Sequence, residues 1–218
     1  MMNKVLVRTI SGICFVLVML AGLLLNKYLF AALVAFIIIG MIVEIFKMPT
    51  AGSDRILWPL LIICYGLVLL VLGFIHGKFS GILLLCFFIM IWSSDVGAFC
   101  TGSLLGQRAG SRKLAPKISP NKSWAGFWGG LVFTAAASLI LNRTGLLPLP
   151  LVHSLALAVL VHCVGVCGDL LESKLKRKCG VKDSGNLIPG HGGLLDRFDS
   201  SMVAVPVGTL YLMIFNLI

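Results

Sequence analysis

Seven long hydrophobic stretches follow one another along the chain, separated by short polar segments. They cover residues 9–25, 28–46, 56–75, 79–99, 124–141, 151–171 and 200–218. A helix that crosses a bilayer needs about 17 to 25 mostly apolar residues, and each stretch approaches or exceeds that length. The pattern predicts an all-α integral membrane protein with about seven transmembrane helices. We expect the first stretch to be a retained helix rather than a cleaved signal peptide.

The composition agrees with this interpretation. Hydrophobic residues make up 59% of the 218 residues and charged residues 12%, whereas about a quarter of a soluble domain is charged. Seven apolar helices in so short a chain leave almost no polar surface to face water, which excludes a soluble fold. We predict a single membrane domain over residues 1–218, with a helical scaffold in residues 1–94 and the catalytic region in residues 95–218.

The basic residues indicate the orientation of the helices. If the N-terminus is inside, 15 of the 18 Lys and Arg lie on the inner side, and only Lys27, Lys78 and Arg143 lie on the outer side. Cytoplasmic loops carry such an excess of basic residues. The two long connections, 100–123 and 172–199, then face the cytoplasm, which in a bacterium places the protein in the inner membrane. The same rule explains the net charge of +10, so we expect no nucleic-acid partner.

Charged residues gather between Gly168 and Ser200, which hold five of the eight acidic residues and six of the eighteen basic ones. Asp169 and Glu172 are three residues apart, as are Asp196 and Asp199, so each pair shares a face if the backbone is helical. With Asp95, these carboxylates can converge near the inner surface. Clustered carboxylates beside cations suit Mg²⁺ and a phosphorylated substrate. Simple salt bridges with neighbouring basic residues explain the charge pattern equally well.

Glycines are frequent within the same segment, at positions 180, 185, 190, 192 and 193. A Gly-rich loop can bring backbone N–H groups close to an anion, and His191 can donate or accept a hydrogen bond there. Ordinary turns would also explain these glycines.

Two segments resemble those of a known family. SKLKRKCGVKDSGNLIPGHGGLLDRFD, residues 173–199, resembles the signature of the phosphatidate cytidylyltransferases, also called CDP-diglyceride synthases. LAPKISPNKSWAG, residues 114–126, resembles the second characteristic segment of that family. The resemblance starts near Asp95 and covers roughly the C-terminal half of the chain.

The resemblance implies transfer of CMP from CTP to phosphatidic acid, which yields CDP-diacylglycerol and pyrophosphate with Mg²⁺ as cofactor. The phosphate of phosphatidic acid is then the nucleophile, so no covalent enzyme intermediate is needed. We expect Asp169, Asp196 and Asp199 to bind the metal, with Glu172 and Asp95 as second choices, and Asp196, Asp169 and Lys182 to carry catalysis. The expected substrate-binding residues are Ser119, Asn121, Lys122, Ser123, Ser173, Lys176, Arg177, Asp183, His191 and Arg197.

Other interpretations stay open at this point. A CTP-dependent polyprenol or phytol kinase would transfer the γ-phosphate to a lipid alcohol instead. A transporter of a phosphorylated solute is a weaker alternative, because the outer halves of the stretches carry almost no charge. Lys122 and its basic neighbours would also suit contact with anionic membrane lipids. The sequence leaves a homodimer open.

Overall fold

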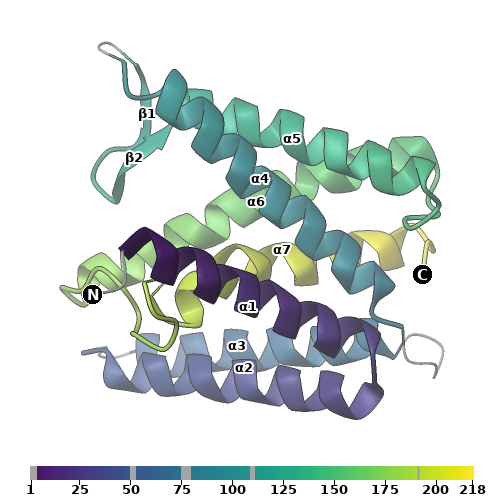
Figure 1. Ribbon diagram of the computed structural model, residues 1–218, viewed down its shortest axis with the longest axis horizontal. Coiled ribbons are helices and arrows are strands. Elements are labelled where there is room, and N and C mark those ends of the chain that lie inside the picture. The colour runs from purple at the N-terminus through teal and green to yellow at the C-terminus, as the bar shows by residue number, and fades with distance from the viewer. Residues whose placement is uncertain (1–3, 50–52, 75–79, 109–110, 191) are drawn as a thin grey trace. The chain divides into compact units, whose positions relative to one another are not determined.

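The described residues fold mainly into helices, with a small β-hairpin in one of the connections (Figure 1). The computed structural model describes residues 4–49, 53–74, 80–108, 111–190 and 192–218. Within these ranges the elements are α1 (Lys4–Leu24), α2 (Lys27–Lys47), α3 (Asp54–Gly73), α4 (Ile82–Leu104), β1 (Lys113–Ala115), β2 (Ser119–Ser123), α5 (Trp124–Arg143), α6 (Leu151–Lys178) and α7 (Leu195–Ile214).

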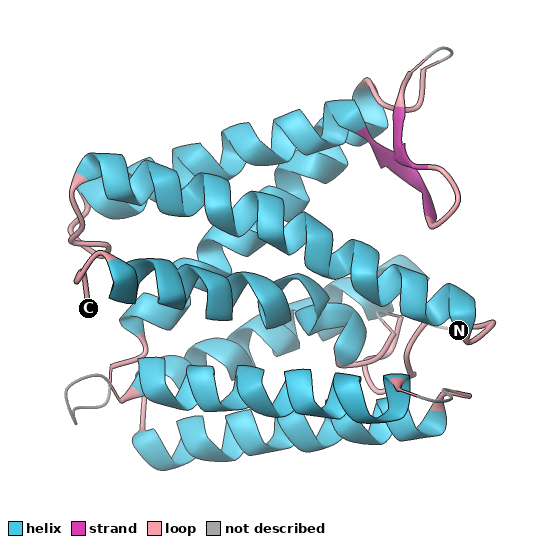
Figure 2. Cartoon of the chain, turned by 180° about the vertical axis from the view of Figure 1, so that it is seen from behind, coloured by secondary structure: helices cyan, strands magenta, loops and turns pink. Residues whose placement is uncertain are grey.

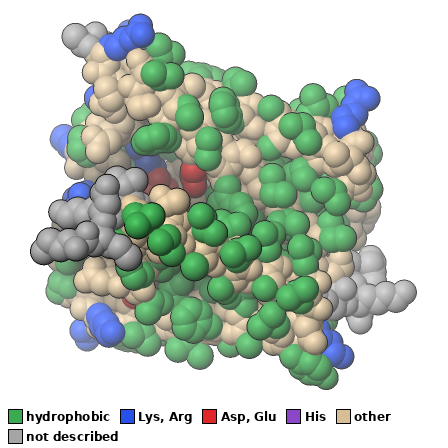
Figure 3. Space-filling view, in the orientation of Figure 1, with side chains coloured by type: hydrophobic (Ala, Val, Ile, Leu, Met, Phe, Trp, Pro, Cys, Tyr) green, Lys and Arg blue, Asp and Glu red, His purple; other side chains and the backbone are tan. Residues whose placement is uncertain are grey.

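The prediction of an all-α membrane protein is confirmed, and the described residues form seven helices. Five helices, α2 to α6, are long and apolar enough to cross a membrane by length and composition. The apolar part of α1, Thr9–Leu24, is shorter, and α7 begins with a charged turn around Asp196. Large hydrophobic side chains such as Phe36, Ile39 and Ile56 are more than half exposed, and hydrophobic side chains dominate the surface in Figure 3. Such surfaces are favourable against lipid.

Two helices extend beyond the hydrophobic stretches that predicted them. Helix α6 continues past residue 171 to Lys178, because Leu, Glu, Lys and Arg form helices well and cations in the last turn favour the helix C-terminus. It is followed by Gly180 with a positive φ of 69°, as is common just after a helix. Helix α4 extends to Leu104. The predicted end of the third stretch, at residue 75, and the predicted start of the fourth, at residue 79, lie outside the described residues.

The β-hairpin lies in the connection predicted as a plain loop (Figure 2). Strands β1 and β2 are antiparallel, with Lys113 opposite Ser123 and Ala115 opposite Ser119. Ser123 then begins α5 as its N-cap, and its side chain accepts a hydrogen bond from the backbone N–H of Gly126 at 3.1 Å. The hairpin therefore places the SPNKS segment, residues 119–123, immediately before the first residue of α5.

The chain divides into two compact units. The first comprises Met1–Ile82 and Leu175–Asp199, and the second comprises Leu83–Lys174 and Ser200–Ile218. Helices α6 and α7 each contribute residues to both units. The expected division at residue 94 stays a prediction.

In the first unit, α2 packs against both α1 and α3, and α2 and α3 run side by side in both ribbon views (Figures 1 and 2). Met41 and Ile45 of α2 and Ile62 and Tyr65 of α3 are fully buried. The buried face of α2 also includes Glu44, which is only 7% exposed.

In the second unit, α4 and α5 approach closely at glycines. A Cβ atom built at Gly97 would lie 2.6 Å from Cβ of Phe133 and 2.8 Å from the carbonyl oxygen of Gly129. One built at Gly126 would lie 3.0 Å from the carbonyl oxygen of Ala98. Small residues allow membrane helices to approach in this way. This contact therefore sets the distance between α4 and α5.

We expect Gly97→Ala to lower the free energy of unfolding by about 1 to 3 kcal/mol, because the added methyl group forces two backbones apart. Gly165→Ala is the matched control within the same unit. Its Cβ would have no neighbour closer than 3.6 Å, and alanine favours a helix over glycine by up to about 1 kcal/mol. Denaturation in mixed micelles measures both variants. Equal stability of the two would contradict the close approach.

Candidate active site

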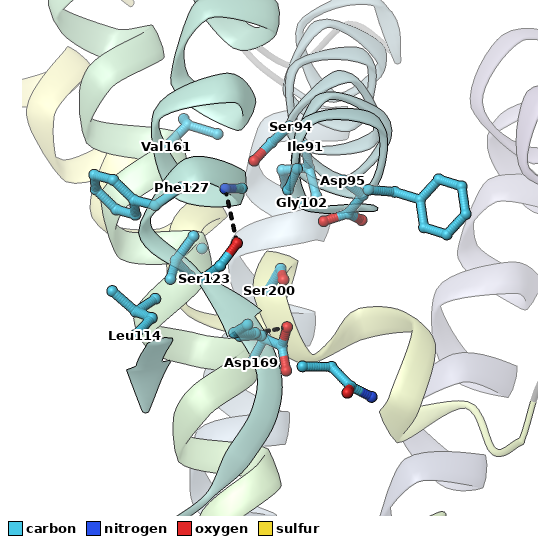
Figure 4. A pocket seen from close by; sticks show the side chains of 17 residues that line it. Ile91, Ser94, Asp95, Gly102, Leu114, Ser123, Phe127, Val161, Asp169 and Ser200 are labelled. Carbon is cyan, nitrogen blue, oxygen red and sulfur yellow. Dashed lines mark hydrogen bonds and ion pairs between the residues drawn. The ribbon is translucent and has the colours of Figure 1, made fainter. Parts of the chain in front are cut away.

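A pocket of about 260 Å³ opens in the second unit among α4, β2, α5 and α6 (Figure 4). Its polar lining includes Asp95, Asn121, Lys122, Ser123 and Asp169, and its other walls are mostly apolar. These five residues come from three distant parts of the sequence. Four of them were expected to contact metal or substrate, and Asp95 was a second choice for the metal.

The hairpin positions one side of this pocket. Nε2 of Gln107 donates a hydrogen bond to the carbonyl oxygen of Asn121 at 3.1 Å, and Nζ of Lys113 donates to Oε1 of Gln107 at 2.8 Å. Ser123 is buried and caps α5. The hydroxyl of Ser123 thus has a structural task in addition to its place in the pocket wall.

Asp169 is the centre of the charged contacts in the pocket. Its carboxylate forms an ion pair with Lys122 and accepts a hydrogen bond from Oγ of Ser173 at 3.2 Å. Glu172, which is fully buried, has a carboxylate oxygen within 4.8 Å of an Asp169 oxygen. Carboxylate oxygens of two residues lie together at this point. Hard oxygen ligands of this kind fit a divalent cation such as Mg²⁺.

Asp196 belongs to the first unit and is surrounded by donors. Its Oδ1 accepts a hydrogen bond from Nζ of Lys176 at 2.6 Å, and its Oδ2 accepts from the backbone N–H groups of Ser184 at 3.0 Å and Gly193 at 2.8 Å. The side chains of Lys176 and Asp196 are 11% and 7% exposed. Residues 179–194, between α6 and α7, form what we call the signature loop. Asp196 therefore connects this loop to the first turn of α7 and to the end of α6.

A second, more polar pocket of about 390 Å³ lies in the first unit. Lys182, Asp183, Asn186 and Arg197 line it, together with backbone at Gly190 and Gly192. Asp183 and Arg197 were expected to bind substrate and Lys182 to carry catalysis. Two of these three residues are cations, so the pocket suits phosphate oxygens. His191 lies outside the described residues.

The remaining expected residues lie at the surface or in the hairpin. Arg177 is exposed and donates to the carbonyl oxygen of Val181 at 3.2 Å. Ser119 is paired with Ala115 in the hairpin. Asp199 is half-buried in the first turns of α7. Because Asp169 belongs to one unit and Asp196 and Asp199 to the other, the convergence of these three carboxylates on one metal stays a prediction.

Cys179 in the signature segment is a poor nucleophile. Burial raises the pKa of its thiol, and the neighbouring Asp54 carboxylate raises it further, while Lys178 opposes both. A thiol with a raised pKa stays protonated near neutral pH and reacts slowly. This agrees with a reaction that needs no covalent intermediate on cysteine.

Sequence reasoning missed two polar groups in apolar helices. One is Glu44, whose signal was a single acidic residue within the apolar run of α2. The other is the buried pair of Ser94 and His162, whose Oγ and Nδ1 atoms are 2.8 Å apart. Ser94 lines the pocket of the second unit, and His162 contacts that side chain without lining the pocket itself.

Comparisons with known proteins agree with these motifs. The profile of the Cytidylyltransferase family matches residues 49–215. A phosphatidate cytidylyltransferase of Bacillus subtilis is 44% identical over 128 residues, which are 59% of this chain and 46% of the relative. One of Haemophilus influenzae is 44% identical over 136 residues, 60% of this chain and 46% of the relative. One of Rickettsia bellii is 33% identical over 214 residues, 94% of this chain and 89% of the relative.

The first two alignments span about half the length of the relatives, whereas the third spans nearly the whole of both chains. The family profile covers both motif segments, the polar lining of the pocket in the second unit and the loop around Asp196. The chain therefore belongs to the cytidylyltransferase family.

Proposed function

We propose that this protein transfers CMP from CTP to phosphatidic acid and releases pyrophosphate, at the cytoplasmic surface of a bacterial inner membrane. The observation that supports this most strongly is the pocket of the second unit. There, Lys122 from one motif segment pairs with Asp169, which directly precedes the other. The names of the relatives supply the reaction, since those proteins are phosphatidate cytidylyltransferases.

The chemistry requires alignment and charge neutralisation rather than a protein nucleophile. The phosphate of phosphatidic acid attacks the α-phosphorus of CTP, and the bond to the pyrophosphate leaving group breaks. Lys122, Lys182 and Arg197 neutralise phosphate charge, and Asn121 offers hydrogen bonds that orient the substrates. The acyl chains stay in the bilayer beside the apolar surface of the helices. CTP, phosphatidic acid and membrane lipids are thus the proposed partners.

We assign Mg²⁺ to Asp169, with Glu172 close enough to assist. Bound Mg²⁺ would stabilise charge on the phosphate oxygens and the leaving pyrophosphate. Asp196 and Asp199 remain the other predicted ligands. A carboxylate offers about four acceptor sites, and those of Asp196 already receive Lys176 and two backbone N–H groups. About one acceptor site is then left, so an ion bound at Asp196 would share the carboxylate with these three donors.

The first test is the reaction of the purified protein in detergent with Mg²⁺, labelled CTP and phosphatidic acid. We expect CDP-diacylglycerol and pyrophosphate, with no product after removal of divalent cations by EDTA and recovery when Mg²⁺ is added back. A lipid kinase would instead give CDP and a phosphorylated lipid from a polyprenol or phytol substrate. That product pattern, or activity that survives EDTA, would contradict the proposal.

Lys122→Ala should lower the rate of CMP transfer by about 100-fold or more, because a cation aimed at the reacting phosphates is lost. Lys117→Ala is the matched control, since Lys117 is an exposed cation in the turn of the same hairpin. Initial rates at saturating and limiting CTP measure both. Equal, small losses would indicate that Lys122 serves only to contact anionic lipid.

Asp169→Asn and Asp196→Asn should affect different properties of the protein. Asp169→Asn should raise the Mg²⁺ concentration needed for half-maximal activity while the fold persists. Asp196→Asn should lower the free energy of unfolding by about 3 to 5 kcal/mol, because it breaks a buried ion pair. Mg²⁺ titrations of activity, together with denaturation in mixed micelles, separate the two effects. A normal Mg²⁺ dependence in Asp169→Asn would refute the assignment of the ion to that residue.

A further inference from the structure

Glu44 is an acidic residue within the apolar helix α2, in its last turn. It is the only acidic residue between Lys27 and Lys47, and it is only 7% exposed. A buried carboxylate is costly unless several donors surround it. Its partners therefore indicate why a carboxylate is tolerated at this position.

Among the described residues, the donors to the Glu44 carboxylate come from the signature loop and the start of α7. Its Oε1 accepts a hydrogen bond from the backbone N–H of Leu194 at 2.8 Å. Its Oε2 accepts from the backbone N–H of Leu195 at 2.9 Å and from Oγ of Ser184 at 2.9 Å. The first N–H groups of a helix have no partner within the helix and carry partial positive charge. Glu44 satisfies two of these N–H groups across about 150 residues of sequence.

The backbone of the loop approaches this carboxylate closely at two glycines. A Cβ atom built at Gly193 would collide with both oxygens of Glu44, and one built at Gly185 would lie 2.7 Å from Oε1. Glycines in this segment can be explained by close approach of backbone to an anion, and at these two positions the anion is the side chain of Glu44. The loop backbone therefore lies close to the Glu44 carboxylate at both positions.

The same loop carries the cations of the polar pocket. Lys182 is two residues before Ser184, and Arg197 is two residues after Leu195, and both line that pocket. Ser184 also connects the carboxylates of α2 and α7, since its hydroxyl donates to Glu44 and its backbone N–H donates to Asp196. Movement of Ser184 or of the start of α7 would therefore displace both cations.

We propose that Glu44 is a positioning residue: its carboxylate holds the signature loop and the N-terminus of α7, and so sets where Lys182 and Arg197 meet substrate phosphate. The consequence for catalysis rests on the proposed function. The anchoring itself does not, because it follows from contacts within the first unit.

The chemistry of the contacts distinguishes this role from simple packing. Backbone N–H groups can only donate, and one of them points at each oxygen of Glu44. Glutamine has the same shape but only one acceptor oxygen, so its NH₂ group must face the N–H of Leu194 or of Leu195. An isosteric substitution therefore leaves one backbone donor unsatisfied, whichever way the amide is turned.

The test compares Glu44→Gln, Ser184→Ala and Asp54→Asn by hydrogen–deuterium exchange of the full-length protein in detergent. We expect Glu44→Gln to accelerate exchange in peptides spanning 184–195 by about ten-fold or more, since hydrogen bonds to a charged acceptor are lost. Ser184→Ala removes one donor and should give a smaller acceleration in the same peptides. Asp54→Asn is the control, because Asp54 belongs to the same unit but pairs with the exposed Lys178.

The kinetic readout uses CTP and phosphatidic acid. Glu44→Gln should raise the KM for CTP by about ten-fold while kcat changes less, because displaced cations weaken binding of the triphosphate. Asp54→Asn should leave both constants near their wild-type values. A fall in kcat alone, with KM unchanged, would overturn the link between Glu44 and the phosphate-binding cations.

The anchoring and the proposed function can fail separately. If Glu44→Gln exchanges like the wild type, or if it loosens α2 and α3 as much as the loop, the anchoring is wrong. If Glu44→Gln does not fold, Ser184→Ala decides, and unchanged exchange in residues 184–195 would overturn the proposal. If the wild type makes no CDP-lipid, the proposed function fails while the exchange experiment still decides the role of Glu44.

Discussion

Buried carboxylates organise the polar segments of this protein, because in an apolar surrounding each of them must collect several donors. Glu44 collects two backbone N–H groups and a hydroxyl, and Asp196 collects an ammonium and two backbone N–H groups. Asp169, whose side chain is 31% exposed, takes an ammonium and a hydroxyl. The loop and hairpin take their conformations largely from these requirements, since short polar segments have little hydrophobic core of their own.

Glycines leave the space that these carboxylates occupy. Gly192 has a positive φ of 84°, and a side chain there would collide with Asp196. Gly193 and Gly185 leave room for Glu44. In the second unit, glycines serve another purpose, because Gly97 and Gly126 let α4 and α5 approach and so set the width of the pocket between Asp95 and Ser123.

The functional residues are divided between two units that share two helices. Asp95, Asn121, Lys122 and Asp169 line a pocket in one unit, and Lys182, Asp183 and Arg197 line a pocket in the other. Helices α6 and α7 cross from one unit to the other. Each pocket by itself carries cations that suit phosphate oxygens.

The amino-acid sequence by itself determined the membrane class, the seven helices of the described residues, the family and most of the polar side chains that line the two pockets. These follow from local patterns: apolar runs of spanning length, and two motif segments with recognisable spacing. Helix ends were less well predicted, because α6 continues as a polar helix where the apolar run stops.

Only the tertiary structure decided which groups meet. It paired Lys122 with Asp169 and Lys176 with Asp196, and it turned a predicted loop into a hairpin that caps α5. It also brought Glu44 to a loop about 140 residues away. No local pattern encodes such a contact, because its energy depends on donors that come together only when the helices pack.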